Sequence, residues 1–151
     1  MPIAEVGLPS ETMSGPDQLV AHGPTIWVDV SLDPDYDPAS GHPPKPSGRE
    51  LIPALIDTGA SESCIDEGLA EELGLEAVDV RKVGGAGGSY DAPVYLVHLY
   101  CQDLISWQYG LFFGVRLTAG GQPHRALIGR TFLADKMMIY DGRRGTVQLV
   151  V

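Results

Sequence analysis

Short runs in which apolar and polar residues alternate recur along the chain and predict a β-rich fold. Between residues 25 and 32, the apolar side chains of Ile26, Val28, Val30 and Leu32 occupy every second position, as in a strand with one buried face. The region 104–117 is apolar enough for a fully buried strand, with a break expected near Gly110 or Gly114. Further strands are predicted at residues 49–56, 76–83, 90–100, 125–128, 137–140 and 146–151.

Only two segments have the spacing of a helix. Ile65, Leu69 and Leu73 recur at intervals of four, and Gly74 follows as a stop signal. Residues 63–66 match a capping box with Asp66 in the position of the usual Glu, so this helix is expected to begin near Ser63. A second short helix is predicted at residues 129–136. Five prolines exclude regular structure at residues 33–48, which we expect to form a long loop between two strands.

The chain length of 151 residues fits one domain with a substantial core. The 19 glycines and 12 prolines favour many turns, and hence a mostly all-β architecture. Residues 1–23 mix Gly, Pro, Ser and acidic groups without periodicity. They are expected to be a flexible N-terminal extension, which could supply a strand in an assembly, while residues 24–151 form the domain.

The charge balance limits the partners of this chain. Ten basic and 20 acidic residues give a net charge of −10, and no basic stripe is present. Nucleic acid and membrane surfaces are therefore excluded as expected partners. No segment resembles a secretory signal or a membrane span, and two cysteines fit a reducing compartment, so a cytoplasmic location is expected. A single disulfide between Cys64 and Cys101 stays open.

The strongest candidate for chemistry is Asp57. An apolar run, Ala54-Leu55-Ile56, leads directly into Asp57, Thr58 and Gly59. A buried strand would therefore deliver a carboxylate to its end, where burial is costly unless that carboxylate is paired or hydrogen-bonded. An isolated tripeptide of this kind is explained equally well as an Asp-capped turn. The interpretation therefore depends on the motifs that follow.

Three motifs in order resemble those of the retropepsin family of single-domain aspartic proteases. The first runs from Asp57 to Ser61, the second is the glycine-rich segment 83–88, and the third is Leu127-Ile128-Gly129-Arg130. The resemblance extends over about residues 24–151. It implies a retropepsin-like closed β-barrel with one or two short helices, and an aspartic endopeptidase that acts on peptide or protein substrates without a metal or other cofactor.

The chemistry of amide hydrolysis explains why one such motif needs a second copy. Two carboxylates about 3 Å apart cannot both ionise, so they share a proton and can activate water on one side while supplying a proton on the other. The chain carries a single Asp-Thr-Gly motif. The resemblance therefore implies a homodimer in which Asp57 meets its symmetry mate.

The resemblance also assigns roles to individual residues. Asp57 would be the catalytic carboxylate, Thr58 would bond across the dimer axis, and Gly59 would let the backbone approach substrate. The segment around Ile128 would brace the catalytic loop and lie at the substrate, and residues 147–151 would interdigitate between subunits. The remaining residues expected to bind substrate are Ala60, Ser61 and Glu62 in the loop and Gly84, Gly85, Ala86, Gly87 and Gly88 at the tip of a flap.

Some positions depart from the viral members of the family. Ser61 and Glu62 stand where those proteins often carry two aspartates, so Arg130 either lacks its usual partner or pairs with Glu62 instead. Ala86 stands where viral flap tips usually carry isoleucine. These departures leave open an alternative, namely a catalytically inactive module of the same fold that dimerises or binds peptides.

Other sites are less well supported by the sequence. The glycine-rich segment lacks the final glycine of a dinucleotide-binding fingerprint and the Lys-Ser/Thr of a phosphate loop. The four histidines have no metal-binding spacing, so they are expected at the surface or satisfied in the core. Cys64 lies at the predicted helix start without a local base, and a buried or capping role is favoured over a nucleophilic one.

Overall fold

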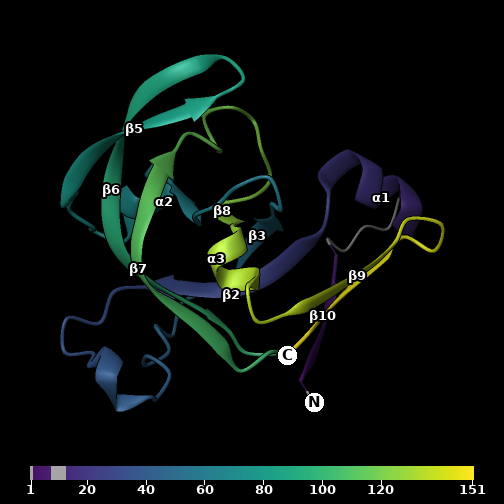
Figure 1. Ribbon diagram of the computed structural model, residues 1–151, viewed down its shortest axis with the longest axis horizontal. Helices are drawn as coiled ribbons and strands as arrows, with labels where there is room; N and C mark the ends of the chain where they lie inside the picture. The colour runs from purple at the N-terminus through teal and green to yellow at the C-terminus, as the bar shows by residue number, and fades with distance from the viewer. Residues whose placement is uncertain (1, 8–12) are drawn as a thin grey trace.

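The computed structural model describes residues 2–7 and 13–151, and β-strands dominate it (Figure 1). The mostly β fold expected from the alternating pattern is confirmed. Seven strands form one large sheet in the order β2-β3-β8-β4-β7-β6-β5, and β2 also pairs with β6. This pairing closes the sheet into a barrel, while β5 stays at an open edge. The strands are β2 (Thr25–Ser31), β3 (Ile52–Ile56), β4 (Cys64–Asp66), β5 (Asp79–Gly85), β6 (Gly88–Cys101), β7 (Ser106–Val115) and β8 (Ala126–Ile128).

The core lies on one face of this sheet. Strand register puts Ile56 beside Ile128 and Ala126 beside Ile65, and all four side chains are buried at 4% exposure or less. Phe112 of β7 completes the same cluster. Because successive residues of a strand point to opposite faces, the residues between these form a second face that lies outside the main core.

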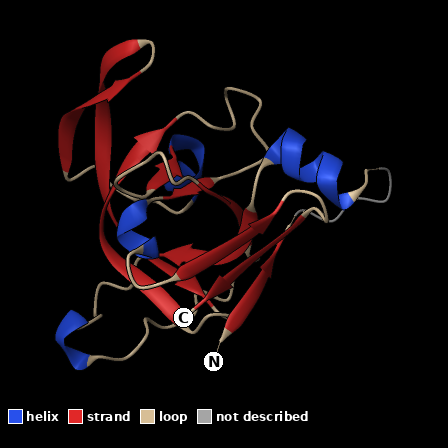
Figure 2. Ribbon diagram, turned by 45° about the vertical axis from the view of Figure 1, so that its right-hand side comes forward, coloured by secondary structure: helices blue, strands red, loops and turns tan. Residues whose placement is uncertain are grey.

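A smaller sheet holds both ends of the chain together. Its order is β1 (Ile3–Val6), β10 (Thr146–Val150) and β9 (Met137–Asp141), with antiparallel pairing throughout. The Val151 N–H donates to the Pro2 carbonyl at 3.3 Å, and β1 runs beside β10 in both ribbon views (Figures 1 and 2). Strand β10 is therefore paired on both edges within its own chain. Residues 147–151 were expected to interdigitate with a second subunit. Because both edges of β10 are already paired, that would require β1 or β9 to be displaced.

The expectation of irregular structure at residues 1–23 is wrong for two parts of that segment. Besides β1, the helix α1 (Gly15–His22) forms, with Ser14 as its N-cap and Pro16 in its first turn. Ala4 and Val6 of β1 and Leu19 of α1 are each exposed by 8% or less. The N-terminal segment thus contributes to the core.

The two predicted helices form but are shorter than expected. Residues Cys64–Asp66 are strand β4, and α2 (Glu67–Glu72) begins only after them, with Asp66 as its N-cap. The predicted start at Ser63 is therefore wrong, whereas Gly74 follows the helix in the left-handed conformation as expected. The second helix, α3 (Arg130–Leu133), covers four residues. Strand β7 continues unbroken through Gly110 and Gly114.

The proline-rich loop at residues 33–48 contains only a short 3-10 helix, η1 (Pro38–Ser40). Its far end is held by Ser47, whose backbone N–H and hydroxyl both donate to the buried Asp29 carboxylate. Near its start, the Tyr36 ring packs edge-on against buried His98 at 4.5 Å between ring centroids.

Among the described residues, no helix is long and apolar enough to cross a bilayer.

Candidate functional site

Asp57 lies at the first position after β3, where the chain leaves the sheet. The Gly59 N–H donates to Asp57 Oδ1 at 2.9 Å, and the Ala60 N–H donates to the Asp57 carbonyl at 3.2 Å. These two bonds fix the carboxylate and the turn that carries it. A Cβ at Gly59 would lie 3.1 Å from Asp57 Oδ1, so a side chain there would crowd the carboxylate. Asp57 is half-buried, and Thr58 and Gly59 are exposed.

Strand β8 and helix α3 hold this loop through backbone bonds. The Asp57 N–H donates to the Ile128 carbonyl at 2.9 Å. On the other side, the N–H groups of Arg130 and Thr131 donate to the carbonyls of Ala60 and Ser61 at 2.9 and 3.1 Å. The segment expected to brace the catalytic loop therefore makes direct contact with it.

Gly129 is required by this close approach. A Cβ at Gly129 would lie 2.4 Å from the carbonyl carbon of Glu62 and 2.9 Å from the Ser63 nitrogen. No side chain fits between these two backbones. The Gly129 N–H instead donates to the Ser63 hydroxyl at 3.1 Å, which ties the end of the loop to β8.

Of the two alternatives left open by the sequence, the structure favours the one in which Arg130 lacks a carboxylate partner, since none of the ion pairs among the described residues includes it. Its Nη1 donates to the Thr58 carbonyl at 2.8 Å. Within the described part of the chain, no ion pair joins Arg130 to Glu62. The guanidinium therefore supports the backbone of the Asp-Thr-Gly turn directly.

The second face of the sheet continues from Asp57 as a half-exposed apolar surface. Register aligns Leu55 with Leu127, Leu127 with Cys64, and Cys64 with Phe113. Asp57 follows Leu55 by two positions, so the strand alternation places its side chain on this same face. Leu55, Leu127 and Phe113 are half-buried, and Cys64 is 9% exposed. We call these four residues the apolar face.

This register corrects one expectation for substrate binding. Ile128 is fully buried and belongs to the core, so it does not face the surface beside Asp57. Its neighbour Leu127 faces the surface beside Asp57 instead. The apolar face cannot be recognised in the sequence, because it depends on the pairing of β8 with β4 and of β4 with β7.

The Cys64 thiol is poorly reactive at this position. Burial raises the pKa of its thiol to about 11, and the nearby Asp57 and Glu62 carboxylates add to the shift. Both cysteines are free and buried, which removes the disulfide alternative. A nucleophilic role needs the thiolate, so the structure supports the buried role and places Cys64 on a strand and not at a helix start.

The glycine-rich segment forms the tip of the β5–β6 hairpin, which extends away from the rest of the barrel (Figure 2). Gly85 pairs with Gly88, so the turn consists of Ala86 and Gly87. Gly88 has a φ of +109°, a conformation that favours glycine. Toward its base the hairpin joins the main sheet, where Val94 aligns with Phe113 of the apolar face.

The histidines give no sign of a metal centre. His98 and His124 are each 1% exposed, and the Nε2 of His124 lies 2.7 Å from the Thr25 hydroxyl. Among the described residues, no three His, Cys, Asp or Glu side chains are grouped so that they could hold a metal ion.

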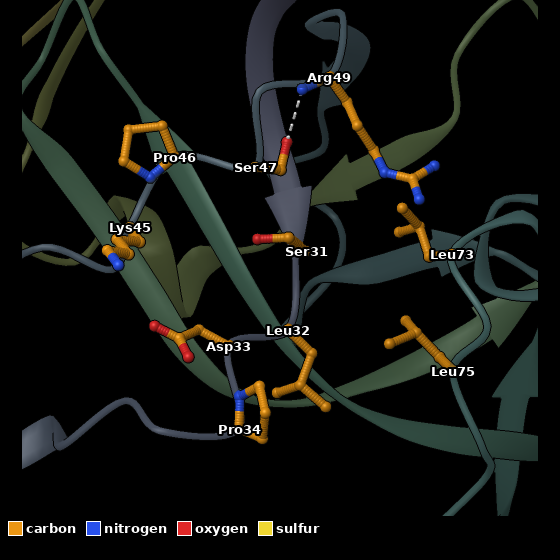
Figure 3. Close-up of a pocket in the computed structure, with 10 residues that line it drawn as sticks. All are labelled: Ser31, Leu32, Asp33, Pro34, Lys45, Pro46, Ser47, Arg49, Leu73 and Leu75. Carbon is orange, nitrogen blue, oxygen red and sulfur yellow. Dashed lines mark hydrogen bonds between the residues drawn. The ribbon is translucent and has the colours of Figure 1, made fainter.

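A pocket of about 340 Å³ lies between the proline-rich loop and the segment after α2 (Figure 3). Its walls include Leu32 and Lys45 on one side and Leu73 and Leu75 on the other, and Arg49 extends toward Leu73. None of its lining residues comes from the Asp57 loop or the hairpin. This pocket is therefore separate from the candidate site.

Part of the chain matches a known family, and the fold is similar to that of a solved structure. Residues 46–102 match the family described as aspartyl protease. The fold is similar to that of a retropepsin-like aspartic protease from Rickettsia conorii, with a TM-score of 0.54 and 15% identity over 97% of this chain and 90% of that one. A protease of EIAV complexed with the inhibitor HBY-793 aligns at a TM-score of 0.46 and 17% identity, over 74% of this chain and 86% of that one. No curated protein sequence matches this chain.

Proposed function

We propose that the chain is a retropepsin-like aspartyl protease and acts as an aspartic endopeptidase in homodimeric form, a proposal supported by the match of residues 46–102 to the aspartyl protease family and by the retropepsin-like fold. The observation that carries the proposal is the Asp57 loop. Its carboxylate is fixed by the Gly59 N–H at 2.9 Å, and the exposed Thr58 and Gly59 beside it leave room for a second copy of the same loop.

In the proposed dimer, the two Asp57 carboxylates share one proton across a two-fold axis. The ionised carboxylate takes a proton from a bound water, which attacks the carbonyl carbon of the scissile peptide. The protonated carboxyl donates to the carbonyl oxygen, and the tetrahedral intermediate collapses when the amide nitrogen receives a proton and leaves as an amine. Each chain contributes half of this machinery.

The surfaces around Asp57 suit a peptide in extended form. The apolar face offers Leu55, Leu127 and Phe113 to apolar substrate side chains, and the exposed Ser61 and Glu62 of the adjacent loop would contact the substrate beside Asp57. The β5–β6 hairpin would act as the flap, with the N–H groups of its tip closing over the substrate and excluding bulk water. The substrate-binding set proposed from the sequence is thus extended by the apolar face, and Ile128 is left out of it.

An inactive module of the same fold is the competing proposal. Two features support it, namely the lack of an ion pair to Arg130 among the described residues and the small Ala86 at the hairpin tip. Against it, the Arg130 guanidinium donates to the Thr58 carbonyl and so supports the turn that carries Asp57. Because backbone bonds to β8 and α3 hold the Asp57 loop in place, we favour the enzyme.

The test is cleavage of a diverse peptide pool between about pH 4 and pH 7, with and without pepstatin. Wild type is compared with Asp57→Asn, which keeps the shape of the side chain. We expect pepstatin-sensitive cleavage with an acidic optimum in wild type and none in Asp57→Asn, because the shared proton is lost once the second carboxyl ionises. Cleavage that survives in Asp57→Asn would rule out this mechanism, and pepstatin binding without turnover in wild type would favour the inactive module.

A further inference from the structure

The side-chain amide of Gln108, near the start of β7, lies between two hydroxyl groups that belong to the support of the Asp57 loop. Its Oε1 accepts from the Ser63 hydroxyl at 2.8 Å, and its Nε2 donates to the Thr131 hydroxyl at 3.1 Å. We propose that Gln108 is a positioning residue for Asp57. This inference rests on the proposed function, because it assigns Gln108 a part in the same catalytic site.

Ser63 and Thr131 are the two points through which Gln108 can act on the loop. Ser63 is 1% exposed and stands at the loop's end, where its hydroxyl also accepts the Gly129 N–H at 3.1 Å. Thr131 belongs to α3, and its backbone N–H donates to the Ser61 carbonyl at 3.1 Å. Gln108 therefore connects β7 to both sides of the contact between the loop and α3.

The directions of the hydrogen bonds show why residue 108 must carry an acceptor for the Ser63 hydroxyl proton. The Ser63 hydroxyl has one proton, which goes to Gln108, so its lone pairs are free to accept the Gly129 N–H. Without an acceptor at residue 108, the buried Ser63 proton must find another partner, and the hydroxyl turns away from Gly129. Gly129 follows Ile128, whose carbonyl accepts the Asp57 N–H at 2.9 Å. Loss of the amide would thus disturb first the bond between Ser63 and Gly129 and then the adjacent bond between Ile128 and Asp57.

A simpler role in fold stability makes a different prediction. If Gln108 only stabilises the barrel, its removal would loosen the whole domain and leave the turnover of the folded enzyme unchanged. If it positions the loop, the effect should concentrate on residues 57–63 and on kcat, because a small displacement of a catalytic group lowers the rate far more than it weakens binding.

The experiment compares Gln108→Leu with wild type, with Gln108→Glu and with the exposed-turn control Gln102→Leu. Leucine keeps the approximate size without hydrogen bonds, whereas a glutamate carboxylate accepts from both hydroxyls. We expect kcat for a cleaved peptide to fall roughly 10- to 100-fold in Gln108→Leu with KM within about twofold. Gln108→Glu should recover most of the rate, and Gln102→Leu should behave as wild type.

Amide hydrogen exchange supplies the readout that does not need activity. In Gln108→Leu we expect faster exchange at Asp57 and Gly129, and unchanged exchange at Val28 of β2. Unchanged exchange at Gly129 together with a wild-type kcat would overturn the positioning role while the protease proposal stands. Equal acceleration at Val28 and Gly129 would also overturn it, since it indicates a general loss of stability. If wild type cleaves no peptide, the proposed function fails, and the exchange comparison still decides whether Gln108 holds the loop.

Discussion

Replacement of Asp66 by asparagine should strongly destabilise the fold. Asp66 is 1% exposed and stands at the junction of β4 and α2. Its carboxylate accepts from the N–H groups of Leu117 and Thr118 at 3.0 and 3.1 Å and from the Thr118 hydroxyl at 2.8 Å. It also caps α2 through the Leu69 N–H at 3.3 Å and lies 3.4 Å from Arg125 Nη2.

The size of the effect follows from these contacts. Asparagine keeps one acceptor oxygen, but its amide group then points at donors, so two or three charge-assisted bonds are lost. Each such bond is worth about 1.5–3 kcal/mol, and part of this is recovered by rotation of the Thr118 hydroxyl. We expect Asp66→Asn to lower the free energy of unfolding by roughly 2–4 kcal/mol, a large share of the 5–15 kcal/mol that is typical of a domain.

The same contacts predict how the effect depends on pH. Burial alone would raise the pKa of the Asp66 carboxyl, but the hydrogen bonds from Thr118, Leu117 and Arg125 outweigh burial and hold the pKa below its ordinary value. The stabilisation is therefore fully present above the ordinary pKa of about 4 and is lost as the pH falls through the lowered value in the folded state.

Urea unfolding at fixed protein concentration, at several pH values, measures the difference between Asp66→Asn and wild type. The control is Asp91→Asn, an exposed hairpin residue paired with exposed Lys82, which should change stability by less than about 1 kcal/mol. The reasoning is refuted if Asp66→Asn is as stable as wild type at pH 7. It is also refuted if the difference does not shrink below about pH 4.

Two further predictions concern the candidate site. In Gly129→Ala, a Cβ 2.4 Å from the Glu62 carbonyl carbon must displace the loop, so peptide cleavage should fall at least about tenfold. The control is Gly7→Ala, because the space around Gly7 is open. A fully active Gly129→Ala would contradict the account. The Cys64 thiol, with a pKa of about 11 where the ordinary value is 9.0, carries about a hundredfold less thiolate than an ordinary thiol. Native protein at pH 8 should therefore react with a thiol reagent at least about a hundredfold more slowly than unfolded protein, and rapid labelling of native Cys64 would show that the site is more open than the structure indicates.

The Asp57 turn and the elements around it could be predicted from the sequence because they carry strong local signals. Asp57 follows an unbroken apolar run, and Gly129 interrupts another, so both chain reversals are visible without knowledge of the fold. The alternation at residues 25–32 likewise predicted β2 closely. Such features depend on residues that are neighbours in the sequence.

Other features could not be predicted because they depend on pairing between distant strands. Ile65 fits both a helical spacing of four and a three-residue strand, and only its pairing with Ala126 and Gly114 decides for the strand. The four-residue strand β1 is too short for a period-two signal to stand out, although Ala4 and Val6 do alternate with exposed neighbours.

The role of Gln108 shows the same limit in the site itself. A single glutamine in an apolar strand gives no indication of its two partners, which lie 45 and 23 residues away in the sequence. Leu127 and Phe113 likewise gain their place beside Asp57 only through sheet register. The motifs identified the carboxylate, and the fold was needed to find the residues that support and surround it.

The central claim, that two copies of Asp57 form one site, is tested most directly by mixing wild type with Asp57→Asn and allowing the subunits to exchange. At equal amounts and constant total protein, random pairing leaves about one quarter of the dimers with two aspartates. The account predicts that cleavage falls to about one quarter of the wild-type rate, following the square of the wild-type fraction. A rate of one half, in linear proportion to the wild-type fraction, would mean that each chain works alone and would contradict it.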